Sequence, residues 1–268
     1  MSTTSEFDDV AVEAVDRIAI LRLNDPKTLN AIPPRMIGGI AQALDHIEKQ
    51  ARPFRTLVVT GAGRGFCSGA NLTTTGPADM LKQDDFGRSL REIYSPVLRR
   101  LRALEMPMIV AVNGPAVGFG FSLALMGDIL LAARSAFFQL SFSRIGLIPD
   151  GAAAWLLPRI VGFNRAKELI VLAERLPAEK ALDWGLVNQV HDDDKLMPAA
   201  MALAAELAER PPATLALLRR AYWEGLDNAF KDQLELEAQL QSAAGKTGDF
   251  REGVMAFREK RQPDFKDG

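Results

Sequence analysis

The chain has 268 residues, of which 48% are hydrophobic and 25% charged, and its formal net charge is -2. This size allows a substantial core, and the composition is that of an ordinary soluble globular protein. The slight acidity gives no general attraction to nucleic acid, and no stretch approaches the roughly 18 apolar residues of a membrane span. The acidic N-terminus has no signal pattern, so we expect a cytoplasmic protein.

Residues that usually bind metals are scarce. Cys67 is the single cysteine, which excludes an intramolecular disulfide and a cysteine-rich metal site. His46 and His191 are the only histidines, and their acidic helical or turn surroundings indicate solvated surface positions. We therefore predict no metal site and a packing role for Cys67.

Strand and helix patterns alternate in the first part of the chain. Apolar runs at residues 17–23, 56–59, 108–112 and 129–132 predict buried strands. Apolar residues at helical spacing predict helices over residues 34–47, over 90–101 with a kink at Pro96, and over 121–126. This alternation predicts an α/β fold.

The chain is predominantly helical after Pro158. Helical patterns cover residues 165–173, 178–184, 197–209, 214–224 and 230–243. Amphipathic helices at one end of a chain either cover the core or pack against other subunits.

Two glycine-bearing loops follow two of the predicted strands. Residues 60–72, TGAGRGFCSGANL, follow the strand at 56–59, and residues 113–120, NGPAVGFG, follow the strand at 108–112. Such loops expose backbone N–H groups, and a helix opening at residues 69–71 would add those of its first turn. Two loops supply the two donors that an oxyanion hole requires. The polar segment 73–87 predicts a mobile stretch beside this site.

The first loop does not match nucleotide-binding patterns. A G-x-G-x-x-G motif beginning at Gly61 would need glycine in place of Phe66, and the dehydrogenase turn would need it in place of Cys67. The loop also lacks the Gly-Lys-Ser/Thr of a P-loop. A tight structural turn is the alternative explanation of its glycines.

Four motifs stand in the order found in one enzyme family. They are PKTLNA at residues 26–31, GFCSGANL at 65–72, AVNGPAVG at 111–118 and IGLIPDG at 145–151. With this combination the chain resembles the enoyl-CoA hydratase/isomerase (crotonase) family over about residues 10–268. The resemblance implies an α/β fold with a crotonase (ClpP-like) spiral of ββα units at residues 1–200 and a C-terminal helical trimerisation region at 201–268. It also implies an acyl-CoA substrate without a further cofactor, and a homotrimer or dimer of trimers.

The resemblance assigns the binding positions as well. The backbone amides of Ala70 and Phe119 would form the oxyanion hole, each contributing on the order of 3 kcal/mol to stabilising an enolate. The implied CoA-contacting positions are Lys27, Thr28, Leu29, Ser68, Ala70, Asn71 and Leu72. A lysine at position 27 suits a CoA phosphate, with a solvated surface lysine as the alternative. Lys260 and Arg261 would add charge to the same CoA from a neighbouring subunit.

The departures from the family pattern concern the catalytic acids. Family hydratases carry two glutamates, and the matching positions here hold Ser122 and Phe142. Asp150 stands where the family's Δ3,Δ2-enoyl-CoA isomerases place a single acid. Its apolar neighbours, Trp155 among them, predict a pKa above the reference value of about 3.9. We therefore predict a 3-enoyl-CoA isomerase of fatty-acid or aromatic acyl-CoA degradation, with Asp150 as the acid/base.

Asp150 also has other interpretations. It could act only as a helix N-cap after Pro149, or as the nucleophile of an aryl-CoA dehalogenase, although Phe142 replaces that enzyme's tryptophan. A ring-modified aromatic CoA thioester would keep the isomerase chemistry. Loss of both glutamates is equally compatible with noncatalytic acyl-CoA binding. Asp128, which lies between apolar runs, predicts a buried structural hydrogen-bond partner rather than a catalyst.

Overall fold

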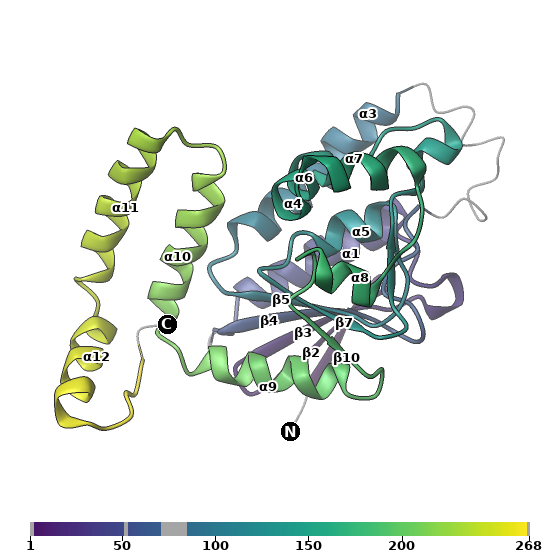
Figure 1. Ribbon diagram of the computed structural model, residues 1–268. Helices are drawn as coiled ribbons and strands as arrows, with labels where there is room; N and C mark the ends of the chain where they lie inside the picture. Colours follow the sequence, from purple (N-terminus) through teal and green to yellow (C-terminus); the bar gives the residue numbers. More distant parts are fainter. Residues whose placement is uncertain (1–2, 51–52, 71–84, 267–268) are drawn as a thin grey trace.

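The computed structural model of the chain describes residues 3–50, 53–70 and 85–266 (Figure 1). Within these residues, seven strands form a sheet in the order β1-β2-β3-β4-β5-β7-β10. They are β1 (Thr3–Phe7), β2 (Val10–Val15), β3 (Ile18–Leu23), β4 (Thr56–Gly61), β5 (Met108–Val112), β7 (Ile129–Ala133) and β10 (Gln189–His191). β1, β2 and β3 pair antiparallel, whereas all neighbours from β3 onward are parallel.

The parallel strands in the middle of the sheet are buried. Every residue of β4 and β5 is buried, as expected for parallel strands covered by helices on both faces. Leu57 pairs with Met108, and Ile109 pairs with Ile129, which confirms the strands predicted at 56–59, 108–112 and 129–132. Because β4 and β5 are parallel neighbours, the loops that follow them leave the same edge of the sheet, where ligands usually bind in α/β folds.

Helices cover both faces of the sheet. α1 (Pro34–Glu48) packs against β1, β2 and β3, and α9 (Leu196–Ala208) packs against β4 and β5. Figure 1 shows α9 on the face opposite α1 and α5 (Phe119–Ala124). α1 begins at a proline, whose missing N–H needs no partner in a first helical turn, and its buried face includes Ile40 and Leu44.

A smaller sheet and several short helices complete the core. Its strands are β6 (Ala116–Val117), β8 (Phe137–Gln139) and β9 (Leu176–Pro177), with β8 pairing parallel to β6 and antiparallel to β9. The short helices are η1 (Pro26–Thr28), α3 (Phe86–Ser89), the π-helical η2 (Leu90–Tyr94), α4 (Ser95–Ala103), η3 (Ser141–Ile145), α6 (Ala153–Val161), α7 (Phe163–Leu172) and α8 (Ala178–Asp183).

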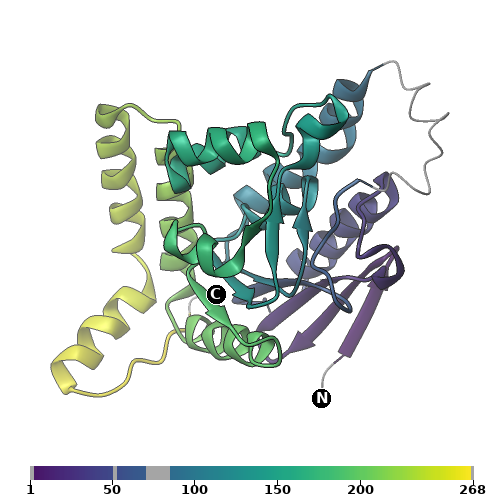
Figure 2. The same ribbon diagram turned by 45° about the vertical axis from the view of Figure 1, so that its right-hand side comes forward.

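Three helices follow α9 and extend away from the core. They are α10 (Pro212–Gly225), α11 (Phe230–Ala244) and α12 (Gly248–Glu259). Figures 1 and 2 both place α11 and α12 outside the rest of the fold, with α10 nearest the core. The predicted division between residues 200 and 201 falls within α9 and stays a prediction. None of the described helices is both long and apolar enough to cross a membrane.

Some expectations about local structure were wrong. The N-terminal residues, for which no element was predicted, form β1 and β2, and α12 was not predicted either. His191 lies half-buried in β10 rather than on a solvated helix or turn, and half-buried His46 packs on the Phe7 ring at 5.3 Å between ring centres. α5 begins at Phe119 rather than at residue 121, because Gly118 turns the chain directly into the helix.

Candidate active site

Direct backbone pairing holds the two glycine-bearing loops together. Cys67 N–H donates to the carbonyl of Pro115 at 3.0 Å, and Val117 N–H donates to the carbonyl of Cys67 at 2.9 Å. These bonds make a parallel bridge between Cys67 and Ala116. Ala70 lies three residues after Cys67, and Phe119 lies three residues after Ala116. Both predicted donors therefore come shortly after the bridge that joins the two loops.

Two glycines allow this close approach. Gly69 has φ of 84°, and a Cβ added there would lie 2.6 Å from the carbonyl oxygen of Val117. Gly118 has φ of 55° and ψ of -124°, a conformation that L side chains disfavour strongly. A side chain at Gly69 would therefore force the two loops apart.

The backbone amides of Ala70 and Phe119 are available to a ligand. Phe119 is the first residue of α5, where an N–H has no partner within the helix. In the described part of the chain, neither the Ala70 N–H nor the Phe119 N–H donates a hydrogen bond to protein. Ala70 and Phe119 both line one cavity of about 990 Å³, called here the active-site chamber. Both N–H donors are therefore available to a ligand in this chamber.

Asp150 lines the same chamber, and its carboxyl group is partly desolvated. Burial raises the pKa of this carboxyl to about 6, which confirms the predicted direction. Its Oδ1 is buried without a hydrogen-bond partner among the described residues, so the structure leaves one carboxyl oxygen uncommitted. Apolar groups beside it in the chamber include Phe142, Leu147 and Trp155. The carboxyl is therefore suited to take up and return a proton near neutral pH.

The loop that carries Asp150 is fixed through its backbone. Ser122 Oγ and Ala153 N–H donate to the carbonyl oxygen of Asp150 at 2.9 and 3.1 Å. α6 starts after Ala152, and no described side chain caps it. The interpretation of Asp150 as a helix N-cap was thus wrong, since its side chain belongs to the chamber.

One face of α4 forms a long wall of the chamber. Ser95, Leu98, Arg99 and Arg102 of α4 line it together with Tyr94, the last residue of η2, at the spacing of a single helix face. Arg102 lies eight positions after Tyr94, which corresponds to about 12 Å at the helical rise per residue. The chamber can therefore hold an elongated acyl group.

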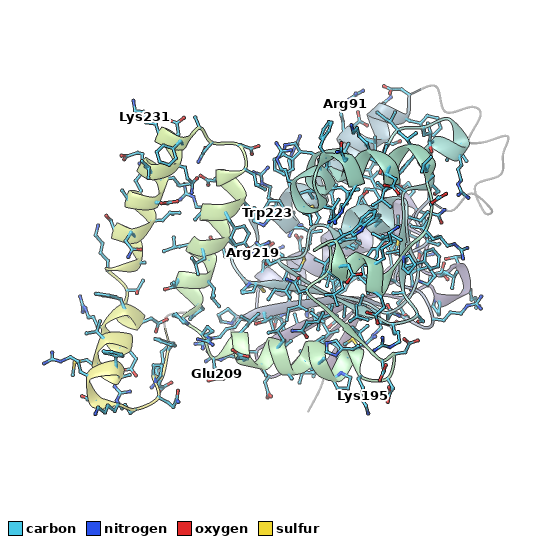
Figure 3. The ribbon with its side chains drawn as sticks, in the orientation of Figure 1. Arg91, Lys195, Glu209, Arg219, Trp223 and Lys231 are labelled. Carbon is cyan, nitrogen blue, oxygen red and sulfur yellow. The ribbon has the colours of Figure 1, made fainter. Side chains whose placement is uncertain are left out.

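Aromatic rings and a cation line the part of the chamber around Arg102. The Arg102 guanidinium lies 5.5 Å from the ring centre of Trp155 and 5.4 Å from that of Trp223, within cation–π range. It also donates to Asp227 at 2.6 Å. Trp223 belongs to α10 and, in Figure 3, lies with Arg219 on the side of α10 that faces the core. Its indole Nε1 is buried without a partner among the described residues.

The predicted CoA-binding turn is attached to the first loop. Ser68 Oγ donates to the carbonyl of Thr28 at 2.8 Å, and Ser68 N–H donates to that of Leu29 at 3.0 Å. Lys27 lies exposed on η1. The described chamber lining includes Ser68 and Ala70 but not residues 27–29. Asn71 and Leu72 lie outside the described residues.

Other singled-out residues have structural partners. Asp128 accepts hydrogen bonds from Met108 N–H, Arg219 Nε and the Tyr222 hydroxyl at 2.7, 2.7 and 2.6 Å, which confirms its structural role. Cys67 is fully buried, and burial raises the pKa of its thiol to about 12, as expected for a packing cysteine. Arg261 pairs with Glu252 within the same chain, and its contact with CoA stays a prediction.

Sequence reasoning missed two residues of the site. Tyr94 was considered only as part of the apolar pattern of the helix predicted over residues 90–101, but it lines the chamber and its ring packs edge-on against Phe119. Ser122 was considered only as a replaced glutamate, whereas it holds the backbone of Asp150. Periodicity could not reveal either contact, because both join segments far apart in the sequence.

The fold and the paired loops define an α/β enzyme of the crotonase type. Residues 13–268 match the family described as enoyl-CoA hydratase/isomerase, and the chain belongs to that family, which acts on acyl-CoA thioesters. The predicted family and fold are thereby confirmed.

Several relatives match nearly the whole chain. It is 44% identical over 253 residues to an Escherichia coli protein named 1,2-epoxyphenylacetyl-CoA isomerase, covering 92% of this chain and 94% of that protein. It is 40% identical over 259 residues to a probable enoyl-CoA hydratase of Rhodobacter capsulatus, covering 97% and 98%. A crystal structure of an enoyl-CoA hydratase/isomerase from Cupriavidus metallidurans superimposes with a TM-score of 0.90 at 33% identity, covering 98% of this chain and 97% of that one. These names include hydratases and isomerases, so family membership alone does not choose between the two reactions.

Proposed function

We propose that this enzyme moves the double bond of a 3-enoyl-CoA thioester to the 2-position. The observation that carries the proposal is the Asp150 carboxyl, with a pKa of about 6 and an uncommitted Oδ1, in the same chamber as the free amides of Ala70 and Phe119. Ser122 and Phe142 at the positions of the hydratase glutamates argue against hydration, because activating water and protonating carbon would need a second acid.

The proposed reaction uses one carboxyl for two proton transfers. Ionised Asp150 removes a proton from C2, and the electrons of that C–H bond move toward the thioester oxygen to form a dienolate. The amides of Ala70 and Phe119 donate hydrogen bonds to this oxygen, where the negative charge develops. Asp150 then returns the proton to C4, the C3=C4 bond is replaced by C2=C3, and the thioester carbonyl re-forms. No atom is gained or lost overall.

Substitution of Asp150 tests the assignment of the base. We expect Asp150→Asn to lower kcat with 3-enoyl-CoA about a hundredfold to ten-thousandfold, and Asp150→Glu to keep more activity than Asp150→Asn. Asp183→Asn, an equal loss of charge at an exposed position of α8, is the matched control and should leave kcat unchanged. An Asp150→Asn enzyme that turns over 3-enoyl-CoA at the native rate would contradict this role.

A panel of 3-enoyl-CoA and 2-enoyl-CoA thioesters separates the possible activities. Double-bond migration without hydration supports the isomerase, whereas hydration alone contradicts it. An ester on Asp150, detected by mass spectrometry during turnover, would instead indicate the nucleophile of a dehalogenase. Thermal stabilisation by CoA thioesters without conversion of any of them would indicate a binding protein.

A ring-containing acyl group is the second candidate for the substrate. The indoles of Trp155 and Trp223 favour it, since both line the chamber, where an aromatic acyl group would meet aromatic side chains. The name of the Escherichia coli relative, 1,2-epoxyphenylacetyl-CoA isomerase, gives further support. Trp223→Leu should then raise KM for a ring-bearing thioester more than for a linear one. An equal rise in KM for both thioesters would contradict the proposal of a ring-containing substrate.

We also propose that α10, α11 and α12 form the interface of a homotrimer or a dimer of trimers. Their large exposed apolar side chains support this proposal, with Phe230 80% and Phe257 86% exposed. Apolar exposure of this extent is unusual for a surface that stays in water. Molar mass measured by light scattering tests it, and a monomer at micromolar concentration would contradict it.

A further inference from the structure

Tyr94 contacts one side of the proposed oxyanion hole directly and is linked to the other side through Ile32. Its ring packs edge-on against the Phe119 ring, with 4.9 Å between ring centres and an interplanar angle of 67°. Its hydroxyl donates to the carbonyl of Ile32 at 3.2 Å, and Ile32 N–H donates to the carbonyl of Gly69 at 2.8 Å. Phe119 supplies one proposed donor, and Gly69 immediately precedes Ala70, which supplies the other.

The conformation of the chain around Tyr94 is unusual. Tyr94 ends the π-helical turn Leu90–Tyr94, and Ser95 N–H bonds to the carbonyl of Leu90 across this wide turn. π-helical turns inside α-helices are rare and often occur at functional sites. Here the turn places the Tyr94 side chain in the chamber wall, against Phe119 at the start of α5.

We infer that Tyr94 is a positioning residue that fixes the separation of the Ala70 and Phe119 amides. The inference rests on the proposed function in that both assign these amides to the thioester oxygen. The ring restrains Phe119, and the hydroxyl restrains the first loop through Ile32. Donors of an oxyanion hole must be held to within a fraction of an ångström, so a loosened contact would weaken both hydrogen bonds to the thioester oxygen.

Tyr94 is not a proton carrier in this arrangement. A tyrosine hydroxyl has one proton, and that proton is donated to the Ile32 carbonyl. Burial also raises the pKa of Tyr94 to about 12, so the hydroxyl stays protonated at neutral pH. Its expected effect on turnover therefore comes from geometry, while the pH dependence belongs to Asp150.

Two substitutions at position 94 separate the contributions of ring and hydroxyl. Tyr94→Phe keeps the ring against Phe119 and removes only the bond to Ile32, whereas Tyr94→Leu removes both contacts. We expect kcat to fall about tenfold in Tyr94→Phe and further in Tyr94→Leu, with KM and the acid limb of the pH profile unchanged. Tyr222→Phe is the matched control, because it removes the same hydroxyl group, here bonded to Asp128 at 2.6 Å, from a position outside the described chamber lining.

The carbonyl stretching frequency of a bound saturated acyl-CoA, isotope-labelled at the thioester carbonyl, gives a readout that needs no turnover. We expect binding to the native enzyme to lower this frequency, Tyr94→Phe and Tyr94→Leu to diminish the shift, and Tyr222→Phe to preserve it. This frequency can be measured even if the enzyme does not isomerise 3-enoyl-CoA. Failure of the proposed reaction is therefore distinguishable from failure of this inference.

Two results would overturn the role of Tyr94. An undiminished carbonyl shift together with native kcat in Tyr94→Phe would show that the hydroxyl restrains nothing relevant to the donors. Loss of one limb of the pH profile in Tyr94→Phe would show that the hydroxyl transfers a proton instead. Tyr94→Phe preserves the volume of the ring, so this comparison stands even if Tyr94→Leu fails to fold.

Discussion

Ser122 Oγ donates a 2.9 Å hydrogen bond to the backbone carbonyl of Asp150. By resemblance, position 122 is that of a glutamate in the family's hydratases, so here a residue at a catalytic position holds the loop that carries the proposed base. A Cβ added to Gly151 would lie 2.6 Å from the Cβ of Ser122, which shows how closely the helix and the loop approach.

Ser122→Ala should therefore act through the position of Asp150. The substitution leaves the carbonyl of Asp150 with one donor fewer, and we expect it to cost about 1 kcal/mol of stability and to lower kcat several-fold without changing KM. Steady-state kinetics and thermal unfolding of the same preparation measure both effects. Native kcat in Ser122→Ala would contradict the role of this hydrogen bond in positioning Asp150.

Activity should depend on pH through the ionisation of Asp150. The base must be ionised to remove the C2 proton, and the pKa of its carboxyl is raised to about 6 by burial. We expect kcat/KM to be nearly constant above pH 7 and to fall about tenfold per pH unit below pH 5. A profile that stays flat from pH 5 to 8 would show that Asp150 does not titrate as the base.

The stability of the folded protein should also depend on the ionisation of Asp150, but it should fall as pH rises, whereas activity should increase. Burial disfavours the charged carboxylate, and the folded-state pKa of about 6 lies above the reference value of 3.8. The contribution of this pKa shift to the free energy of unfolding is thus fully present below about pH 3.8 and is lost as the pH rises through 6. The melting temperature of Asp150→Asn should accordingly exceed that of the native enzyme more at pH 7.5 than at pH 4, at equal protein concentration. A difference in melting temperature that does not change with pH would indicate that the substitution acts through something other than the charge of Asp150.

Asp128 should affect stability without affecting the chemistry. It and Arg219 are 10% and 3% exposed and form a 2.7 Å ion pair between the core and α10. Asp128→Asn leaves the buried guanidinium without its counter-charge and should cost about 3 to 5 kcal/mol. Melting temperature at fixed protein concentration checks this, and the folded fraction should retain native kcat, because Asp128 is not in the described chamber lining. Equal melting temperatures of Asp128→Asn and the native protein would contradict a stabilising role of the ion pair.

The sequence predicted the parallel part of the sheet because buried parallel strands are continuous apolar runs, as at residues 56–59 and 108–112. It also placed the two loops correctly after those strands. β9 and β10 were missed because two or three residues are too few to establish a period.

The predicted pKa shift of Asp150 succeeded for a similar reason, since apolar residues surround it in the sequence as well as in the chamber. The contacts of Tyr94 with Ile32 and Phe119 could not be predicted, because each crosses more than twenty residues of chain. Local patterns show which residues a segment buries. They do not show which distant segment those residues meet.

The π-helical turn Leu90–Tyr94 determines which face of the following helix, α4, lines the chamber. Each residue of an α-helix turns the chain by about 100°, so deleting one residue from this turn would swing the whole α4 stripe about a quarter of a circle. Tyr94 would then lose Phe119 while Arg102 lost Trp155 and Trp223. The proposed positions of the oxyanion donors and of the acyl-contacting tryptophans thus both depend on this turn, and we expect a change in its length to alter both together.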